Sequence, residues 1–147
     1  MLVERILPIA LERLSTIEAD AILPDAAKVL SDTHKSLVVV CNADGKMIGV
    51  ITKTDIVRQV ANCPGRPCTM AAAAVMTRNV TYCHPGDPLH DVLSKMKVSG
   101  FVHIPIVDQD SRPCGVINAR DALQLLLGDV EYDVLLLRDY VMGIGYR

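Results

Sequence analysis

Hydrophobic and polar positions recur along the chain at an offset of 66 residues. When the 147-residue sequence is aligned with itself at that offset, residues 14–61 match residues 80–127 without a gap. Seven of the paired residues are identical, and most of them lie in one block, Gly49-Val50-Ile51 and Asp55, which matches Gly115-Val116-Ile117 and Asp121. A repeat at one fixed offset predicts two copies of the same supersecondary unit.

Each copy predicts the same order of elements. In the first copy, Pro24 suits the first turn of a helix that continues over residues 25–30. The unbroken apolar run at 37–40 indicates a strand buried on both faces. A turn at 43–46, with Gly45 free to adopt a positive φ, leads to a second strand at 47–51. A helix then begins at Thr52 and runs to about residue 61, and the second copy places the same parts at 88–98, 102–107, 108–112, 114–117 and 119–127.

This order predicts an α/β (α+β) fold made of two repeats. Each repeat leaves one sheet face uncovered, so we expect the two to pack together about a pseudo-two-fold axis. The expected division is a first repeat with the N-terminal segment at 1–62, a linker at 63–71, a second repeat at 72–127 and a C-terminal helix at 128–147. The apolar stripe of that last helix is Val134, Leu135, Leu137 and Val141.

Composition narrows the class of partner. The chain is 50% hydrophobic, with a mean hydropathy of +0.30, which favours burial of surface against a second copy and hence a homodimer. A net charge of −2 without a basic block argues against nucleic-acid binding. The longest apolar run, residues 70–76, is far shorter than the ~20 residues of a membrane span. Five cysteines, an odd number, and no signal-peptide pattern predict reduced thiols in the cytoplasm.

Catalytic and metal signatures are missing from the sequence. It has no phosphate-binding glycine loop with Lys and no nucleophile motif. The four histidines, His34, His84, His90 and His103, lack the spacing of metal ligands. The segment Cys63-Pro-Gly-Arg-Pro-Cys68, with two prolines and a glycine, is more typical of a linker than of a metal or redox site. We therefore expect neither an enzyme nor a metal protein.

One repeated four-residue segment has two interpretations. It is Thr52-Lys53-Thr54-Asp55 in the first copy and Asn118-Ala119-Arg120-Asp121 in the second. Thr or Asn followed three positions later by Asp is a helix-capping pattern. The same residues at a strand's carboxyl end also suit a nucleotide, because a carboxylate accepts the two hydrogen bonds of a ribose diol and the helix N–H groups face phosphate. Since Asp55 repels phosphate, cations such as Lys53, Arg78, His103 or Arg120 would be needed. The two roles are compatible.

Three segments carry a family resemblance. Gly49-Val50-Ile51-Thr52-Lys53-Thr54-Asp55 resembles the end of a CBS domain, the repeat named after cystathionine β-synthase. Val75-Met76-Thr77-Arg78-Asn79-Val80 resembles its first segment, and His103-Ile104-Pro105-Ile106-Val107-Asp108 resembles its central strand. The resemblance spans about residues 6–127 as a tandem pair. It implies two β-α-β-β-α repeats that bind AMP, ADP, ATP, NAD or S-adenosylmethionine in the cleft between them, and that usually dimerise as a flat disc.

The resemblance also assigns roles to residues. Thr52 matches the family's phosphate-side hydroxyl, Asp55 its ribose-binding carboxylate and Asp121 the second carboxylate, while Asn118 stands where Ser or Thr is usual. The candidate ligand contacts are Thr52, Lys53, Asp55, Thr77, Arg78, Asn79, His103, Ile104, Pro105, Asn118, Arg120 and Asp121. We expect one occupied cleft rather than two, in a regulatory module that senses an adenine nucleotide and is read by an unidentified partner protein. The alternative is an interaction and dimerisation module with vestigial pockets.

Overall fold

The computed structural model describes residues 1–63 and 69–128. Residues 64–68 of the predicted linker lie outside these ranges. So does the predicted C-terminal helix beyond residue 128, with its apolar stripe from Val134 to Val141.

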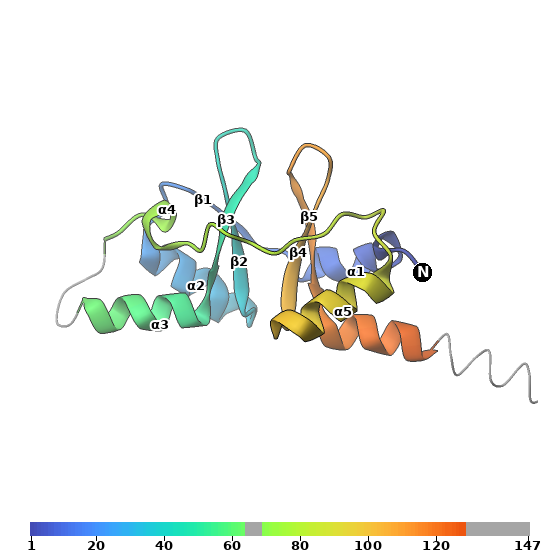
Figure 1. Ribbon diagram of the computed structural model, residues 1–147. Coiled ribbons are helices and arrows are strands. Elements are labelled where there is room, and N and C mark those ends of the chain that lie inside the picture. The colour runs from blue at the N-terminus through green and yellow to red at the C-terminus, as the bar shows by residue number, and fades with distance from the viewer. Residues whose placement is uncertain (64–68, 129–147) are drawn as a thin grey trace, which may run out of the picture.

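The first repeat follows the predicted order. It consists of β1 (Thr16–Glu18), α2 (Leu23–Thr33), β2 (Leu37–Cys41), β3 (Met47–Thr52) and α3 (Lys53–Asn62) (Figure 1). β1 pairs in parallel with β2, which pairs antiparallel with β3. Pro24 lies in the first turn of α2 as predicted, and Gly45 has a φ of +77° in the turn between the strands. The helix α2 extends further than expected, to Thr33.

The second repeat has the same parts in a reduced form. It contains α5 (Leu89–Ser99), β4 (His103–Val107) and β5 (Pro113–Asn118), and residues 119–128 are helical. β4 and β5 pair antiparallel. In the place of β1, this repeat has a single parallel bridge between Cys83 and Ile106. The predicted fold class, two β-α-β-β-α repeats, is therefore confirmed.

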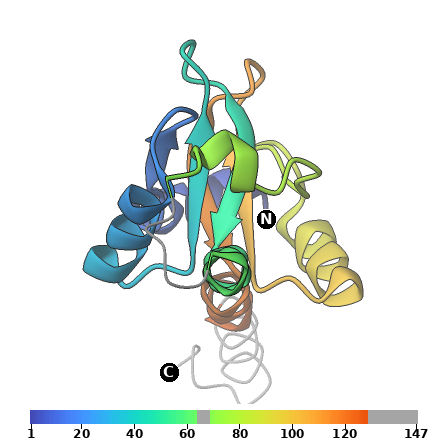
Figure 2. The same cartoon turned by 90° about the vertical axis from the view of Figure 1, so that its left-hand side faces the viewer.

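The segment that precedes each repeat packs on the other repeat. Residues 2–13, which include η1 (Val3–Ile6) and α1 (Leu7–Glu12), share a buried core with α5, β4 and β5. Residues 71–79, which include α4 (Ala72–Val75), share a core with α2, β2 and β3. Figure 1 shows α1 beside the β4–β5 hairpin, and Figures 1 and 2 both show α4 beside β3. We call these two stretches the crossing segments; they link the two repeats into one body.

The strands of the two hairpins are buried on both faces, as the apolar run at 37–40 predicted. In β2, Val38 and Val40 face the core under α2 and α3, whereas Leu37 and Val39 face the other repeat. There they meet Val50, Val116 and the neighbouring apolar side chains in a shared cluster. The hairpins consequently stand side by side (Figures 1 and 2), and their tips are joined by a hydrogen bond from the Met47 N–H to the Ser111 carbonyl (2.8 Å).

The glycine of the repeated motif allows the crossing segments to lie directly on the strands. A Cβ at Gly49 would be 2.8 Å from the Thr77 carbonyl oxygen and 2.5 Å from the sulfur of Met76. A Cβ at Gly115 would be 2.7 Å from Cβ of Ala10 and 2.9 Å from its carbonyl carbon. Both positions therefore require a residue without a side chain.

We expect Gly115→Ala to lower the free energy of unfolding by about 1–3 kcal/mol, because the added methyl meets the backbone of α1, which cannot rotate away. Urea denaturation followed by circular dichroism measures the change. Gly86→Ala is the matched control, because a Cβ at that position meets nothing within 4 Å. If both variants unfold at the wild-type midpoint, α1 does not lie on β5 in solution.

Candidate functional site

A pocket of about 230 Å³ lies between the two repeats, and we call it the first pocket. Its walls come from β3 and the start of α3, from the second crossing segment, and from residues 101–105 of the second repeat. Seven of the predicted contacts meet there: Thr52, Asp55, Thr77, Asn79, His103, Ile104 and Pro105. The other lining residues, which were not among the predicted ligand contacts, are Leu37, Val50, Thr54, Arg58, Val80, Thr81 and Phe101.

Asp55 is the buried charged group of this pocket, with 8% of its surface exposed. The Thr52 hydroxyl oxygen accepts a hydrogen bond from the Asp55 N–H (3.2 Å), and the Asp55 carboxylate accepts one from the Thr52 N–H (3.0 Å). The predicted helix cap is thus present. The carboxylate also accepts hydrogen bonds from the Thr77 hydroxyl (3.3 Å) and from the Arg58 guanidinium (3.4 Å). Capping fixes the carboxylate at the pocket wall, where it can also accept hydrogen bonds from a ligand.

Thr77 reaches Asp55 because its backbone is paired with β3. The Val50 N–H donates to the Thr77 carbonyl (3.0 Å), and the Thr77 N–H donates to the Val50 carbonyl (2.8 Å). The adjacent Gly49 leaves room for this pairing. The motif glycine therefore contributes to the site by positioning a residue far from it in sequence.

A second pocket of about 200 Å³ lies on the other side of the pseudo-two-fold axis. Two of its residues, Val116 and Asn118, are the counterparts of Val50 and Thr52 at the 66-residue offset. Leu37 and His103, which are counterparts of each other, line both pockets. The remaining lining residues are Arg13, His34, Lys35 and Ser36.

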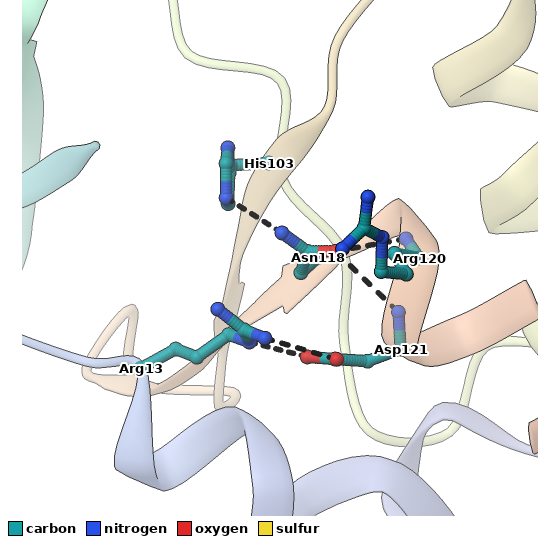
Figure 3. Close-up of polar contacts among 5 residues, drawn as sticks. All are labelled: Arg13, His103, Asn118, Arg120 and Asp121. Atoms are coloured by element: carbon teal, nitrogen blue, oxygen red, sulfur yellow. Dashed lines mark hydrogen bonds and ion pairs between the residues drawn. The ribbon is translucent and has the colours of Figure 1, made fainter. Parts of the chain in front are cut away.

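The counterpart of Asp55, Asp121, is bound by an arginine from the first crossing segment. Arg13 donates through Nη2 to Asp121 Oδ1 (2.9 Å) and through Nε to Oδ2 (Figure 3). This contact raises the pKa of Arg13 above its ordinary value, with burial acting against it. The helix cap is supplied by Asn118, whose amide oxygen accepts from the N–H groups of Arg120 (2.8 Å) and Asp121 (3.4 Å). Asp121 does not line the second pocket.

Three predicted cations lie outside the lining of both pockets. Lys53 lines a separate groove between α2 and α3. Arg78 is exposed and donates to the Ala73 carbonyl (3.2 Å), and Arg120 is exposed. The structure brings Arg58 and Arg13 to the carboxylates instead. Arg58 follows Asp55 by three positions, a spacing that signals a contact on one helix face, whereas no sequence pattern links Arg13 to Asp121.

His103 stands between the two pockets as a neutral ring. The Asn118 amide oxygen is used in capping, so its Nδ2 donates to His103 Nε2 (2.8 Å), and that ring nitrogen accepts. Burial lowers the pKa of His103, and Arg13 lowers it further, while Asp121 acts in the opposite direction. The ring therefore resists protonation near neutral pH.

No group of three His, Cys, Asp or Glu side chains in residues 1–63 and 69–128 is placed to hold a metal ion. In the same part of the chain, no helix combines the length and the apolar character that crossing a membrane requires.

We expect His103 to titrate below its ordinary pKa of 6.5. The unfolded chain then binds this proton more readily than the folded chain, so the free energy of unfolding falls as the pH drops from 6.5 toward the folded-state pKa. NMR titration of the imidazole measures the pKa, and His103→Gln identifies the resonance and removes this part of the pH dependence. A ring that titrates at 6.5 or above would contradict the assignment.

Curated relatives match this chain over most of its length. A homoserine O-acetyltransferase of Methanohalobium evestigatum is 25% identical over 80% of this chain, and an L-aspartate semialdehyde sulfurtransferase of Methanocaldococcus jannaschii is 27% identical over 77%. The chain spans only 23% and 21% of the length of these two proteins. An uncharacterised 17.7 kDa protein of Acidianus ambivalens is 26% identical over 81% of this chain and 71% of its own length.

Solved structures share the architecture. The CBS domain pair of protein MJ0100, in complex with 5′-methylthioadenosine and S-adenosyl-L-methionine, superimposes with a TM-score of 0.72 at 27% identity, covering 88% of this chain and 98% of that one. The CBS-domain containing protein ATU1752 from Agrobacterium tumefaciens gives 0.71 at 25% identity, with 85% and 98% covered. The sequence model of the CBS domain matches residues 8–62 and 72–128. The chain belongs to the CBS domain family and carries two copies of that domain.

Proposed function

We propose that the first pocket binds an adenosine-type ligand and that the chain is a regulatory module with no chemistry of its own. The observation that carries the proposal is Asp55, a buried carboxylate fixed by Thr52 and Thr77 at a pocket formed by both repeats. The domain pair of MJ0100 was solved with two adenosine derivatives, 5′-methylthioadenosine and S-adenosyl-L-methionine, which supports the ligand class.

Each part of an adenosine has a matching wall. The two carboxylate oxygens of Asp55 suit the two hydroxyls of the ribose. Phe101, Ile104 and Pro105 offer an apolar wall to the base. The positive end of the α3 dipole and the Thr54 hydroxyl suit a negatively charged group attached at the 5′ position.

The charge of the pocket favours ligands with few phosphates. Its lining holds one carboxylate, Asp55, and one arginine, Arg58, while His103 is neutral. Three or four negative charges of ATP would find little compensation there. Adenosine, AMP, 5′-methylthioadenosine and S-adenosylmethionine therefore fit better than ADP, ATP or NAD.

A ligand in this pocket contacts both repeats, which gives it a way to act as a signal. Binding favours the relative placement of the repeats that makes the most contacts, and a partner protein that prefers this placement reads the occupancy. The partner and the cytoplasmic location stay predictions.

Isothermal titration calorimetry with adenosine, AMP, ATP, NAD and S-adenosylmethionine tests the ligand. We expect Asp55→Asn to weaken binding of the best ligand at least about tenfold, because the amide loses the charge and one acceptor that the ribose uses. Asp91→Asn is the matched control, since Asp91 lies in the first turn of α5 with 75% of its side chain exposed. Millimolar or weaker binding of every ligand by the wild-type chain would refute the proposal.

We infer a homodimer from an apolar strip along one side of the molecule. α3 and the helix at 119–128 lie along the same side in both views (Figures 1 and 2). They leave large apolar side chains in solvent: Val57 (69% exposed), Val60 (58%), Leu123 (52%) and Leu127 (49%). Burial of such a strip against a second copy is a source of association energy. This observation also supports the alternative function, an interaction module, if no ligand binds.

Sedimentation velocity tests this inference. The wild-type chain of 16.0 kDa should sediment as a dimer, and Val57→Lys combined with Leu123→Lys should shift it to the monomer, because two charges cannot be buried without partners. Val98→Lys is the control, since Val98 is 89% exposed and belongs to α5, which is not part of the strip. A wild-type monomer at 100 µM or so, well above typical dimer dissociation constants, would contradict the inference.

A further inference from the structure

The two pockets have equivalent positions and different chemistry. At the 66-residue offset, Asp55 corresponds to Asp121, and Asn79 corresponds to Arg13. In the first pocket, the carboxylate of Asp55 is part of the lining. In the second pocket, the carboxylate of Asp121 is turned to Arg13 and is not part of the lining.

A ribose finds no carboxylate in the lining of the second pocket. Arg13 takes both oxygens of Asp121, through Nε and Nη2, in a two-point charge-assisted contact (Figure 3). Because the lining of the second pocket contains Arg13 and not Asp121, a ribose that reached Asp121 would have to displace this guanidinium and put neutral hydroxyls in its place. The exchange is unfavourable, because hydrogen bonds between charged groups are stronger than those to a neutral hydroxyl.

The same contact leaves the second pocket with a basic lining. Two of its eight lining residues, Arg13 and Lys35, are cationic, two more are histidines, and none is acidic. The Nη1 group of Arg13 is not used in the contact with Asp121. The Lys35 ammonium donates to the Leu14 carbonyl and the Ser15 hydroxyl (3.0 Å each), and its third hydrogen remains available.

The helix at 119–128 adds to this positive potential. It begins beside Asn118, which lines the pocket, so the positive end of the helix dipole lies at the wall. A tetrahedral oxyanion would be held there by donors from Arg13, Lys35 and Asn118.

We propose that Arg13 excludes nucleosides from the second pocket and prepares that pocket to bind a phosphate group. The exclusion rests on the proposed function of the first pocket, whereas the binding of phosphate does not. Because Leu37 and His103 line both pockets, the phosphate group has two possible sources: free inorganic phosphate, or a nucleotide whose adenosine part lies in the first pocket.

Adenosine stoichiometry in the full chain tests the exclusion. The wild-type chain should bind one adenosine per chain, and Asp55→Asn should remove that binding. Arg13→Asn places at this position the amino acid that its counterpart, Asn79, has in the first pocket, and it should raise the stoichiometry to two adenosines per chain. Adding Asp121→Asn to this variant should return the stoichiometry to one. A wild-type chain that binds two adenosines, one of them lost in Asp121→Asn, overturns the exclusion while the proposed function stands.

Inorganic phosphate tests the second part, with the NMR signals of the His103 ring as the readout. Titration should shift these signals to saturation in the wild type, and Arg13→Asn should weaken phosphate binding at least about tenfold, the loss of one charge-assisted contact. Arg13→Lys keeps the charge and should retain part of the affinity. Equal phosphate affinity in the wild type and Arg13→Asn, or no shift of His103 at all, overturns this part.

Comparison of AMP with adenosine distinguishes the two sources. If the phosphate of a bound nucleotide reaches the second pocket, Arg13→Asn weakens AMP and leaves adenosine unchanged at the first pocket. If free phosphate is the ligand, Arg13→Asn changes the affinities for AMP and adenosine alike, and inorganic phosphate binds to the wild-type chain together with adenosine. Amide spectra and thermal unfolding of each variant establish that it is folded, and a chain that binds phosphate but no adenosine rejects the proposed function alone.

Discussion

Two close backbone contacts, at Gly49 and Gly115, determine how the rest of this protein is arranged. At each one a crossing segment from one repeat lies directly on a strand of the other, at a separation that leaves no space for a Cβ. The contact at Gly49 pairs Thr77 with β3 and brings its hydroxyl to Asp55. The contact at Gly115 seats α1 on β5, and α1 ends at Arg13 beside Asp121. Both carboxylates of the repeated motif thus acquire their partners through the same construction.

Gly49 and Gly115 have equivalent places in the two repeats, but the chemical outcomes of the two contacts differ. The second crossing segment brings a neutral hydroxyl to Asp55, which lines the first pocket, whereas the first crossing segment brings a guanidinium to Asp121, which does not line the second pocket. The two hairpins have the same register, but the crossing segments differ in backbone: Thr77 pairs with Val50 as an extended bridge, whereas Arg13 follows the helix α1. The difference at the two carboxylates therefore depends on which side chain each crossing segment presents. Duplicated units can therefore acquire different ligand chemistry without any change of fold.

Packing of the two hairpins brings the two chemically different pockets close together. Leu37, Val39, Val50 and Val116 hold the two sheets against each other, so the pockets lie close together and share Leu37 and His103 as walls. A ligand in either pocket contacts residues of both repeats. His103, which lines both pockets, is hydrogen-bonded to Asn118 of the second pocket.

Much of the fold follows from local pattern. The buried strand at 37–40, the turn at Gly45, the helix start at Thr52 and the two-repeat order were predicted correctly, because period, turn chemistry and capping are encoded by neighbouring residues. β1 was not identified, since it has three residues and its pairing partner β2 lies some 20 residues away. The crossing of residues 2–13 onto the second repeat also left no pattern in the sequence.

The sequence by itself determined that two α/β units are present and that each places a capped carboxylate at a strand's end. It also supplied seven of the residues that line the first pocket. Only the tertiary structure decided which partner each carboxylate has. Arg13 and Asp121 are 108 positions apart, and their contact arises from the way α1 packs on β5. Such a contact depends on the packing of elements that are distant in the sequence, so the spacing of residues along the chain does not predict it.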